Sequence, residues 1–349
     1  MNHSILPILF LSIILVFSSC FRDVVRDIGI DNKPFNNFDD KGNTQLTAGS
    51  EIIILIPDIQ NYIYYKRYNK ILESIIDRII EINKIGYKVK AVVQVGDITE
   101  TNSPDEWKIA KTIFSKLDSV KINYILTTGN HDYSNSEIPH LRQTFFNDYF
   151  DFSGQPSFKK CFIDTYYENS LFEINIHGKP FQIIALEFGP REVVLEWANK
   201  VMDKNKKGLL VTHAYLFKHN ERYNWINLKN SQSISPYNYS QNNKSFEGDV
   251  NDGEDIWQKL IYPHGNIYFV ACGHKTKPDY IGNLISKNIQ DKNVLQMLFN
   301  TQDLPNGGDG WIQILEFKND RKVVGIKTYS CVYNKWNNDS ICQYNFIYE

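Results

Sequence analysis

Residues 52–60 have the sequence IIILIPDIQ, in which an apolar run leads directly into Asp58 and Gln60. The run 52–57 has the length and composition of a β-strand buried on both faces, which is typical of parallel sheets. Polar residues that follow such a strand lie at the carboxyl edge of the sheet, where open α/β folds bind ligands. This stretch therefore predicts both an element of the fold and candidate functional residues.

The segments that follow repeat this plan. Apolar residues recur at helical spacing over 71–80, and Gly86 stands where that helix would end. Residues 89–95 form a second predicted strand and residues 122–127 a third. Between them, Ser103-Pro104-Asp105-Glu106 predicts a helix start with a Ser cap, an early Pro and a Glu three residues after the cap. Alternating strands and helices predict parallel pairing with right-handed crossovers.

The rest of the chain supplies further elements without a linker. A hairpin is predicted where two apolar runs flank His177-Gly178-Lys179, and a helix is predicted from Pro190. Further strands are predicted at 209–212, 267–271, 294–300, 311–317 and 323–329. Residues 217–252 are polar and rich in Asn, and are too long for an ordinary connection, which predicts a surface insertion near the site. Residues 50–349 are accordingly predicted to form one domain.

Short polar motifs end five of the predicted strands. They are Asp58-Ile59-Gln60, Gly96-Asp97, Gly129-Asn130-His131-Asp132, Thr212-His213 and Gly273-His274. Each motif alone has an ordinary explanation, since Asp and Gly-Asp form turns and a single His can belong to the core. Together, and in this order, they deliver carboxylate, amide and imidazole groups to one sheet edge, which indicates a metal site.

This pattern resembles the calcineurin-like metallophosphoesterases, whose motifs run D-x-H, GD-x-x-[DE], GNH-[DE], H and G-H-x-H. The resemblance spans about residues 52–274, and Gly96-Asp97-Ile98-Thr99-Glu100 matches the second motif. It implies an α/β fold, a four-layer α/β/β/α sandwich of the metallophosphoesterase type, with the C-terminal strands in the second sheet. It also implies two divalent metal ions, and Zn, Mn or Fe suit the mixed nitrogen and oxygen ligands.

The resemblance assigns the metal ligands residue by residue. The predicted ligands are Asp58, Gln60, Asp97, Asn130, His213 and His274. Asp97 is expected to bridge both ions, and Asn130 and the two His residues to complete the second site. In the first site, Gln60 replaces the usual His, and Thr276 stands where the last motif has its second His. The first site is therefore expected to be weak or empty, and the second to be tighter.

The expected reaction is hydrolysis of a phosphate ester by a metal-bound hydroxide, because adjacent cations stabilise both the attacking and the leaving oxygen. His131 resembles the family's general acid, and Asp132 is expected to stabilise its imidazolium form. Arg191, at a predicted strand-to-helix turn, is a candidate clamp for the substrate phosphate. The alternative is a non-catalytic metal- or ligand-binding surface lipoprotein with a degraded first metal site.

The net charge of the chain, and two motifs that its sequence lacks, limit the classes of partner and substrate that we expect. A formal net charge of −2 gives no global attraction to nucleic acid, so no specific nucleic-acid partner is indicated. The chain has neither the G-x-x-x-x-G-K-[ST] loop of nucleotide-dependent phosphoryl transfer nor the G-x-S-x-G turn of serine hydrolases. The expected substrate is a phosphorylated small molecule or polymer.

The N-terminal segment predicts export. Residues 5–17 form a short apolar run, and Ser18-Ser19-Cys20 follows, which resembles a lipobox whose Cys is acylated. Residues 1–20 are thus predicted to be a lipoprotein signal peptide, with an uncleaved signal anchor as the alternative, and residues 21–49 a flexible tether. The protein is expected to be membrane-anchored through the lipid on Cys20, in the periplasm or on the cell surface. Cys331 and Cys342 are candidates for a disulfide in that oxidising space.

Overall fold

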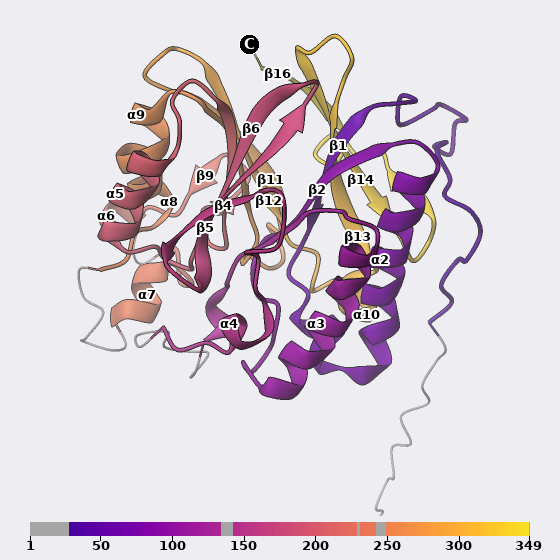
Figure 1. Ribbon diagram of the computed structural model, residues 1–349, viewed down its shortest axis with the longest axis horizontal. Coiled ribbons are helices and arrows are strands. Elements are labelled where there is room, and N and C mark those ends of the chain that lie inside the picture. The colour runs from indigo at the N-terminus through magenta and orange to yellow at the C-terminus, as the bar shows by residue number, and fades with distance from the viewer. Residues whose placement is uncertain (1–27, 134–141, 229–230, 242–248, 349) are drawn as a thin grey trace, which may run out of the picture.

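The computed structural model describes residues 28–133, 142–228, 231–241 and 249–348 (Figure 1). The predicted signal peptide, the lipidation site Cys20 and residues 21–27 of the predicted tether lie outside the described residues. Among the helices that are described, none has both the length and the apolar character needed to cross a bilayer.

Two seven-stranded sheets form the centre of the molecule. The first has the order β15-β14-β13-β1-β2-β3, with β16 paired to β14. Its strands are β1 (Glu51–Ile56), β2 (Lys88–Gln94), β3 (Tyr124–Leu126), β13 (Trp311–Phe317), β14 (Val323–Ser330), β15 (Lys335–Asn337) and β16 (Tyr344–Ile347). β1, β2 and β3 are parallel, as the alternating pattern predicts, whereas the C-terminal strands add on in antiparallel pairs.

The second sheet has the order β11-β12-β10-β7-β6-β5-β4. Its strands are β4 (Phe158–Ile163), β5 (Tyr166–Ile176), β6 (Lys179–Leu186), β7 (Lys207–Thr212), β10 (Ile267–Cys272), β11 (Ile281–Lys287) and β12 (Asn293–Phe299). The hairpin predicted around Gly178 joins β5 to β6. The parallel strands β6, β7, β10 and β12 form the middle of this sheet, so their carboxyl ends lie at one edge.

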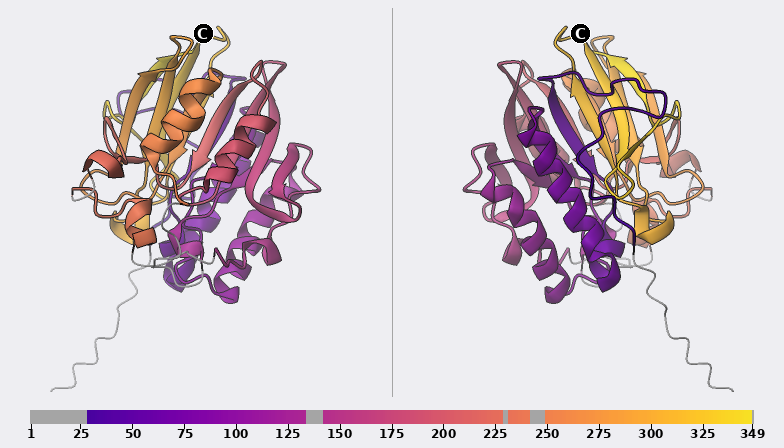
Figure 2. Two further views of the ribbon diagram at one scale, coloured as in Figure 1. Left: turned by 90° about the vertical axis from the view of Figure 1, so that its left-hand side faces the viewer. Right: turned by 90° about the vertical axis from the view of Figure 1, so that its right-hand side faces the viewer.

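Helices cover the outer face of each sheet (Figures 1 and 2). α2 (Asn69–Lys84) and α3 (Pro104–Ser119) pack on the first sheet, and α5 (Glu192–Val201) and the π-helix η5 (Trp257–Ile261) on the second. Between the sheets the rings of Phe181, Phe269 and Phe317 pack with centroids 5.6–6.2 Å apart. This arrangement confirms the predicted four-layer α/β/β/α sandwich.

Shorter elements complete the chain. They are α1 (Gln60–Tyr64), η1 (Lys66–Tyr68), η2 (Asn130–Asp132), α4 (Phe146–Tyr149), β8 (Leu216–Lys218), β9 (Glu221–Arg222), α6 (Trp225–Leu228), α7 (Pro236–Gln241), α8 (Gly253–Ile256), α9 (Tyr262–His264) and α10 (Pro305–Gly308). The helix start predicted at Ser103 is confirmed, because the Ser103 hydroxyl accepts from the Glu106 amide and the Glu106 carboxylate accepts from the Ser103 amide.

The predicted tether differs from the structure over residues 28–49. This segment lies against the first sheet, where the Phe35 ring packs on Tyr329 at 5.1 Å and Leu46 is buried. Its main chain is also hydrogen bonded to the domain, since the Thr47 amide donates to Glu316 at 2.6 Å and Arg78 donates to the Lys33 carbonyl at 3.0 Å. A few anchoring side chains in this polar segment outweigh its composition, so folded structure is already present from residue 28, whereas the prediction placed the start of the domain at residue 50.

The predicted insertion 217–252 is more ordered than a surface loop. Its described part contains the β8–β9 hairpin, α6 and α7, and the rings of Trp225 and Tyr237 stack at 5.9 Å. Gln232 is fully buried, where its amide accepts from the Asn224 amide and donates to the Arg222 carbonyl. The insertion therefore has its own hydrogen-bonded frame, which allows it to hold groups against the site.

Four cysteines lie in the described residues, and all are buried thiols: Cys161, Cys272, Cys331 and Cys342. The disulfide considered between Cys331 and Cys342 is not formed. Burial raises the pKa of the Cys331 and Cys342 thiols to about 12, so both stay protonated and unreactive near neutral pH.

The buried ion pair between Glu316 and Lys327 allows a stability prediction. The two charged atoms lie 2.9 Å apart, and the Glu316 side chain is fully buried. Burial acts to raise the pKa of Glu316, but Lys327 and the hydrogen-bond donors outweigh it and lower the pKa. Lys327→Met leaves a buried carboxylate without its counter-charge, which is expected to cost about 3–5 kcal/mol of unfolding free energy in urea titrations at pH 7.

The pH dependence distinguishes this charge effect from lost packing. In the wild-type protein the lowered pKa of Glu316 contributes stability above its unfolded value, and that contribution is lost as pH falls through the folded pKa. In Lys327→Met only the Thr47 amide and the Ser50 hydroxyl still oppose the effect of burial on Glu316, so its pKa rises. The carboxyl then takes up a proton more readily on acidification, and the deficit shrinks from pH 7 to pH 5. Lys287→Met, which breaks the exposed pair with Asp291, is the control and should have little effect. A pH-independent deficit would contradict the charge argument.

Candidate metal centre

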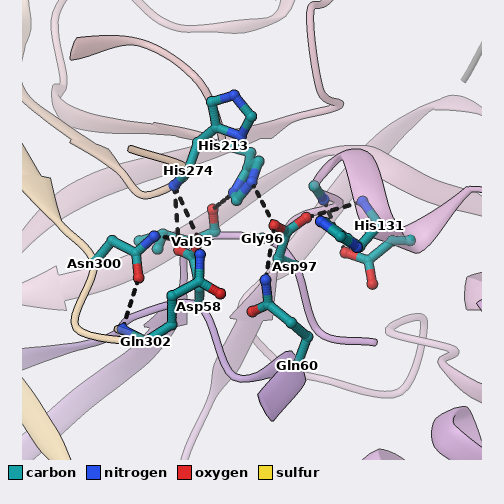
Figure 3. Close-up of polar contacts among 12 residues, drawn as sticks. Asp58, Gln60, Val95, Gly96, Asp97, His131, His213, His274, Asn300 and Gln302 are labelled. Carbon is teal, nitrogen blue, oxygen red and sulfur yellow. Dashed lines mark hydrogen bonds and ion pairs between the residues drawn. The ribbon is translucent and has the colours of Figure 1, made fainter. Parts of the chain in front are cut away.

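Strand ends from both sheets meet at one edge of the sandwich (Figure 3). Asp58 follows β1, Asp97 follows β2, Asn130 begins η2 after β3, and the two His residues follow β7 and β10. The carboxyl ends of parallel strands share an edge, which is why residues far apart in sequence meet here. The predicted ligands Asp58, Gln60, Asp97, Asn130, His213 and His274 are all at most 5% exposed.

Asp97 is the centre of this group. Ligand atoms of Asp97, His213 and His274 all lie within 4.8 Å of one another. The Asp97 Oδ2 atom lies 3.1 Å from His213 Nε2 and accepts from Gln60 Nε2 at 3.1 Å, while Oδ1 accepts from the His131 amide at 3.0 Å. The structure thus places the predicted bridging carboxylate in contact with three of the five motifs.

Hydrogen bonds orient both imidazole rings. His213 Nδ1 donates to the Val95 carbonyl at 2.9 Å, which leaves Nε2 facing the Asp97 carboxylate. His274 Nε2 donates to the Ile234 carbonyl at 2.7 Å, which leaves Nδ1 as the ring nitrogen available to a ligand. Metal-ligating His residues are typically held in this way, with the other ring nitrogen donating to a carbonyl or carboxylate.

The charge states of these groups suit a cation. Burial, followed by His213, lowers the pKa of His274 to about 3, so its ring is neutral and able to ligate. Burial also acts to lower the pKa of His213, but the charges of Asp97 and Asp58 outweigh it and raise the pKa to about 9. A proton can therefore occupy the position between His213 Nε2 and Asp97. A metal ion at that position would displace this proton, as metal binding to His sites generally does.

Two buried amide oxygens of predicted ligands, Gln60 Oε1 and Asn130 Oδ1, have no donor among the described residues. His213 Nε2, in contrast, faces the Asp97 carboxylate at 3.1 Å. Leaving a buried acceptor unpaired costs about 1–3 kcal/mol, so such atoms call for a partner. Oxygen and imidazole nitrogen atoms around a carboxylate are a donor set for a divalent cation. The residues present therefore fit a metal ion around Asp97.

The backbone at the site is strained in two places. Asp97 and His274 both adopt left-handed conformations, with φ of 52° and 69°. Such conformations cost of the order of 1–3 kcal/mol in non-glycine residues and cluster at functional sites. Two motif glycines permit the close packing around them, since a Cβ on Gly129 would overlap Asp97 Oδ1 and one on Gly273 would overlap Asp58 Oδ1.

Asp58 contacts neutral donors at the site. Its Oδ2 accepts from Asn300 Nδ2 at 2.7 Å and from the His274 amide at 3.1 Å. Burial raises the pKa of Asp58 well above its ordinary value. The His274 amide also lies 3.3 Å from Asp58 Oδ1, so these contacts orient both carboxyl oxygens. Among the described residues, the group of ligand atoms within 4.8 Å of one another contains Asp97, His213 and His274 and does not include Asp58.

His131 has a different partner from the one expected. Its Nδ1 lies 3.0 Å from the Glu100 carbonyl and 3.5 Å from the Glu100 carboxylate. Asp132, predicted to stabilise the imidazolium, instead accepts from the amides of Ile98, Thr99 and Gly129 at 2.8–3.1 Å. The hydrogen bonds of Asp132 therefore tie the Asp97 loop to the Asn130 loop. The Asp132 charge still helps to raise the His131 pKa, as predicted, but after Asp97 and Glu100, and Glu100 is the residue that lies against the ring.

Arg191 also differs from its predicted role. Its Nε and Nη2 atoms donate to the two Glu187 carboxylate oxygens at 2.9 and 3.2 Å. Glu187 is buried, and Arg142 Nη1 lies 3.3 Å from the same carboxylate. The bidentate edge of the Arg191 guanidinium that a phosphate would need is thus engaged within the fold, because a buried carboxylate requires compensation.

Sequence reasoning missed three groups that shape the site. The sequence could have identified Glu100 as a site residue, since it fits the second motif three residues after Asp97. The sequence could also have identified Asn300, because it directly follows strand β12, just as the other polar site residues directly follow strands. No feature of the sequence could have identified the Ile234 carbonyl, since every residue has a carbonyl and only the folded insertion brings this one to His274.

The fold and the site together define a metallophosphoesterase-type protein, with a candidate metal centre at the carboxyl edge of a four-layer sandwich. The chain belongs to the calcineurin-like phosphoesterase family, whose sequence model matches residues 52–301. The uncharacterized protein YvnB of Bacillus subtilis (strain 168) is 26% identical over 263 residues, which cover 72% of this chain and 18% of that protein. The chain thus spans less than a fifth of this relative's length.

Solved structures with a similar fold are distant. A purple acid phosphatase from yellow lupin (Lupinus luteus) is 10% identical with a TM-score of 0.47, covering 86% of this chain and 54% of that one. A 5'-nucleotidase precursor from Thermus thermophilus is 11% identical with a TM-score of 0.41, over the same shares. A phosphopantetheinyl hydrolase from Mycobacterium tuberculosis is 11% identical with a TM-score of 0.36, covering 72% and 89%.

Proposed function

We propose that the chain is a metal-dependent phosphoesterase that hydrolyses a phosphate ester with His131 as general acid. The observation that carries this proposal is the convergence of Asp97, His213 and His274, whose ligand atoms lie within 4.8 Å of one another, with the Gln60 amide held on the same Asp97 carboxylate. Asp97, Asn130, His213 and His274 would hold one cation, and Asp58 and Gln60 would share Asp97 with a second. When bound, such ions activate water and neutralise charge on the phosphoryl oxygens.

The chain's own residues support the acid step. His131 Nδ1 is held by the Glu100 carbonyl, so Nε2 is the ring nitrogen left to face a leaving oxygen. Burial acts to lower the pKa of His131, but Asp97 and Glu100 outweigh it and raise the pKa. A raised pKa keeps more of the ring protonated near neutral pH, which is the form that donates a proton. About 29% of the side chain is exposed, which gives a substrate access to it.

Removing and restoring metal tests the proposal. Purified protein treated with a strong chelator is expected to lose hydrolysis of p-nitrophenyl phosphate or its bis-ester, and to regain it with added Zn²⁺, Mn²⁺ or Fe²⁺. Comparing the two substrates also determines whether monoesters or diesters are preferred. Activity that survives complete metal removal would contradict the proposed function.

A non-catalytic metal- or ligand-binding role is the second candidate. The substitutions that favour it are Gln60 and Thr276, which stand where the family has metal-binding His residues. A protein that binds its metal but is inert toward a broad panel of phosphate esters would support this role over hydrolysis.

We also propose that the protein is exported and acts at a membrane surface through a lipid on Cys20, in the periplasm or on the cell surface. The support is the short apolar run at 5–17 followed by Ser18-Ser19-Cys20. Radiolabelled palmitate should be incorporated into the expressed wild-type chain and not into Cys20→Ser. Equal labelling of the two chains would exclude Cys20 as the acceptor.

A further inference from the structure

An exposed group of aromatic and basic side chains lies directly beside the candidate metal centre. α1 begins at the candidate ligand Gln60 and ends at Tyr64, which is 50% exposed, and the next residue, Tyr65, is 44% exposed. Because an α-helix rises about 1.5 Å per residue, Tyr64 lies about 6 Å from Gln60 along the helix axis. We name this group the aromatic-basic surface, and it consists of Tyr64, Tyr65, Lys66, Arg67, Tyr68 and Lys70.

The rings of the aromatic-basic surface pack on one another, and its charges are all positive. The ring centroids of Tyr64 and Tyr65 lie 5.0 Å apart, and the Arg67 guanidinium lies 4.7 Å from the Tyr68 ring. The three basic residues of the surface are exposed, and no ion pair between described residues involves them. Residues 60–72 contain no Asp or Glu. The surface is therefore locally cationic in a chain whose formal net charge is −2.

This combination of side chains suits the surface of a lipid bilayer. A Tyr ring has an apolar body and a polar hydroxyl, and Tyr is enriched where membrane and water meet. Lys and Arg are attracted to anionic headgroups, and their aliphatic stems can lie along apolar material. The aromatic-basic surface thus has the chemistry of a site that rests on anionic lipid.

The described chain begins at the same end of the molecule. Ile28 and Gly29 line a groove that Lys70 of the aromatic-basic surface also lines. Figure 2 shows the indigo start of the described chain at the end of the molecule that carries α10. α10 packs on the aromatic-basic surface, since a Cβ on Gly307 would lie 3.2 Å from the Tyr68 ring. The segment that leads to the proposed lipid therefore leaves the domain next to this surface.

The short distance along the chain between the proposed lipid and the domain limits how the domain can be oriented. Seven residues, 21–27, separate Cys20 from Ile28. Fully extended, the chain from Cys20 to Ile28 spans at most about 28 Å. A domain of this size is about 50 Å across. The lipid cannot reach past the opposite edge of the sheets, so the end of the domain that holds Ile28 and the aromatic-basic surface lies nearest the bilayer.

We propose that the aromatic-basic surface docks the domain on an anionic lipid bilayer, with the metal centre facing the membrane. This inference rests on the proposed anchor at Cys20 and goes beyond it, because it gives the orientation of the anchored domain. In this orientation the phosphate esters nearest the metal centre are those of lipid headgroups. The proposal therefore also names a substrate class for the proposed hydrolysis.

Iodination of tyrosines in the full chain, mapped by mass spectrometry, tests the docking surface without an activity assay. Vesicles of phosphatidylglycerol and phosphatidylcholine are expected to protect Tyr64 and Tyr65 from labelling. Tyr262 is 39% exposed and precedes β10, at the edge opposite the metal centre, so its labelling should not change. Vesicles of phosphatidylcholine alone should protect less, because each basic side chain near anionic lipid strengthens docking about 5-fold. Equal labelling of Tyr64 and Tyr65 with and without anionic vesicles would overturn the proposal.

Two triple variants with the same change in net charge provide a matched comparison. They are Lys66→Gln with Arg67→Gln and Lys70→Gln on the aromatic-basic surface, and Lys84→Gln with Lys88→Gln and Arg321→Gln at the opposite edge. The first should weaken docking on the anionic vesicles about 100-fold and restore the labelling seen without vesicles, whereas the second should keep the protection. Thermal unfolding of each variant checks that the fold is kept.

The remaining outcomes separate this inference from the proposed function. Protection that is lost in both triple variants, or in neither, would overturn the docking surface and leave the proposed hydrolysis standing, since that reaction is measured on a soluble ester. Protection of Tyr64 and Tyr65 by a single-stranded oligonucleotide but not by vesicles would assign the surface to nucleic acid and would also overturn the proposal. The lipid on Cys20 is tested independently by palmitate incorporation.

Discussion

Asp97→Asn is expected to lower kcat/KM for phosphate-ester hydrolysis by at least about 10³-fold, equivalent to roughly 4 kcal/mol of transition-state stabilisation. The physical reason is that the Asp97 carboxylate contacts His213, Gln60 and the His131 amide at once. Asparagine has almost the same shape but no charge, so it can neither balance nor bridge cations. Steady-state kinetics together with metal counting measure the effect.

The control for this variant is Asp291→Asn, which removes an exposed carboxylate paired with Lys287 outside the five motifs. It should leave both kcat/KM and metal content unchanged. If Asp97→Asn kept its metal and most of its activity, Asp97 would not be the shared ligand, and the assignment of the whole site would have to be changed.

His131→Asn is expected to have an effect that depends on the leaving group. Loss of a general acid costs about 10²- to 10⁴-fold when the departing oxygen is a strong base that must be protonated, as in an alkyl phosphate. The effect should be less than about 10-fold for p-nitrophenyl phosphate, because its stable phenolate leaves without a proton. Kinetics on a series of esters with graded leaving-group basicity measure the difference.

The comparison of an alkyl phosphate with p-nitrophenyl phosphate is internally controlled, because both substrates are assayed with the same His131→Asn protein. An equal loss on both would indicate that His131 binds the phosphate or supports the Asp97 loop through its amide, which donates to Asp97 at 3.0 Å. Glu100→Gln adds a further check. It keeps the carbonyl that accepts from His131 Nδ1 but removes the carboxylate 3.5 Å away, so the limb of the pH profile that reports His131 should move to lower pH as the His131 pKa falls.

Much of the fold could be predicted because it depends on local patterns. The strand at 52–57 and the helix start at Ser103 follow from apolar runs and capping chemistry, and both are present in the structure. The meeting of Asp58, Asp97 and His213 at one edge was also predictable, since parallel strands present their carboxyl ends together. The prediction for residues 28–49 was wrong, because a few anchoring side chains in this polar segment outweigh its composition.

The side-chain partners within the site were harder to predict from the sequence. Asp132 and Glu100 are both acidic and both lie near His131 in the motifs, and only the folded loops decide which carboxylate reaches the ring. Arg191 had the right chemistry for a phosphate, but its position four residues after Glu187, just before α5, pairs it within the fold. Which partner a side chain contacts depends on the direction in which it points, and the spacing of residues in the sequence does not define that direction.

The amino-acid sequence by itself determined the parallel strands of the first half and the edge at which the candidate site lies, because both depend on residue type and short-range periodicity. The six candidate ligands followed from the resemblance of the sequence motifs to those of the family. Only the tertiary structure decided how those residues are held: the Ile234 carbonyl on His274, the Asn300 amide on Asp58 and Glu100 beside His131. These contacts join residues from tens to more than two hundred positions apart. Their geometry arises from packing the two sheets and the insertion together, which no local pattern encodes.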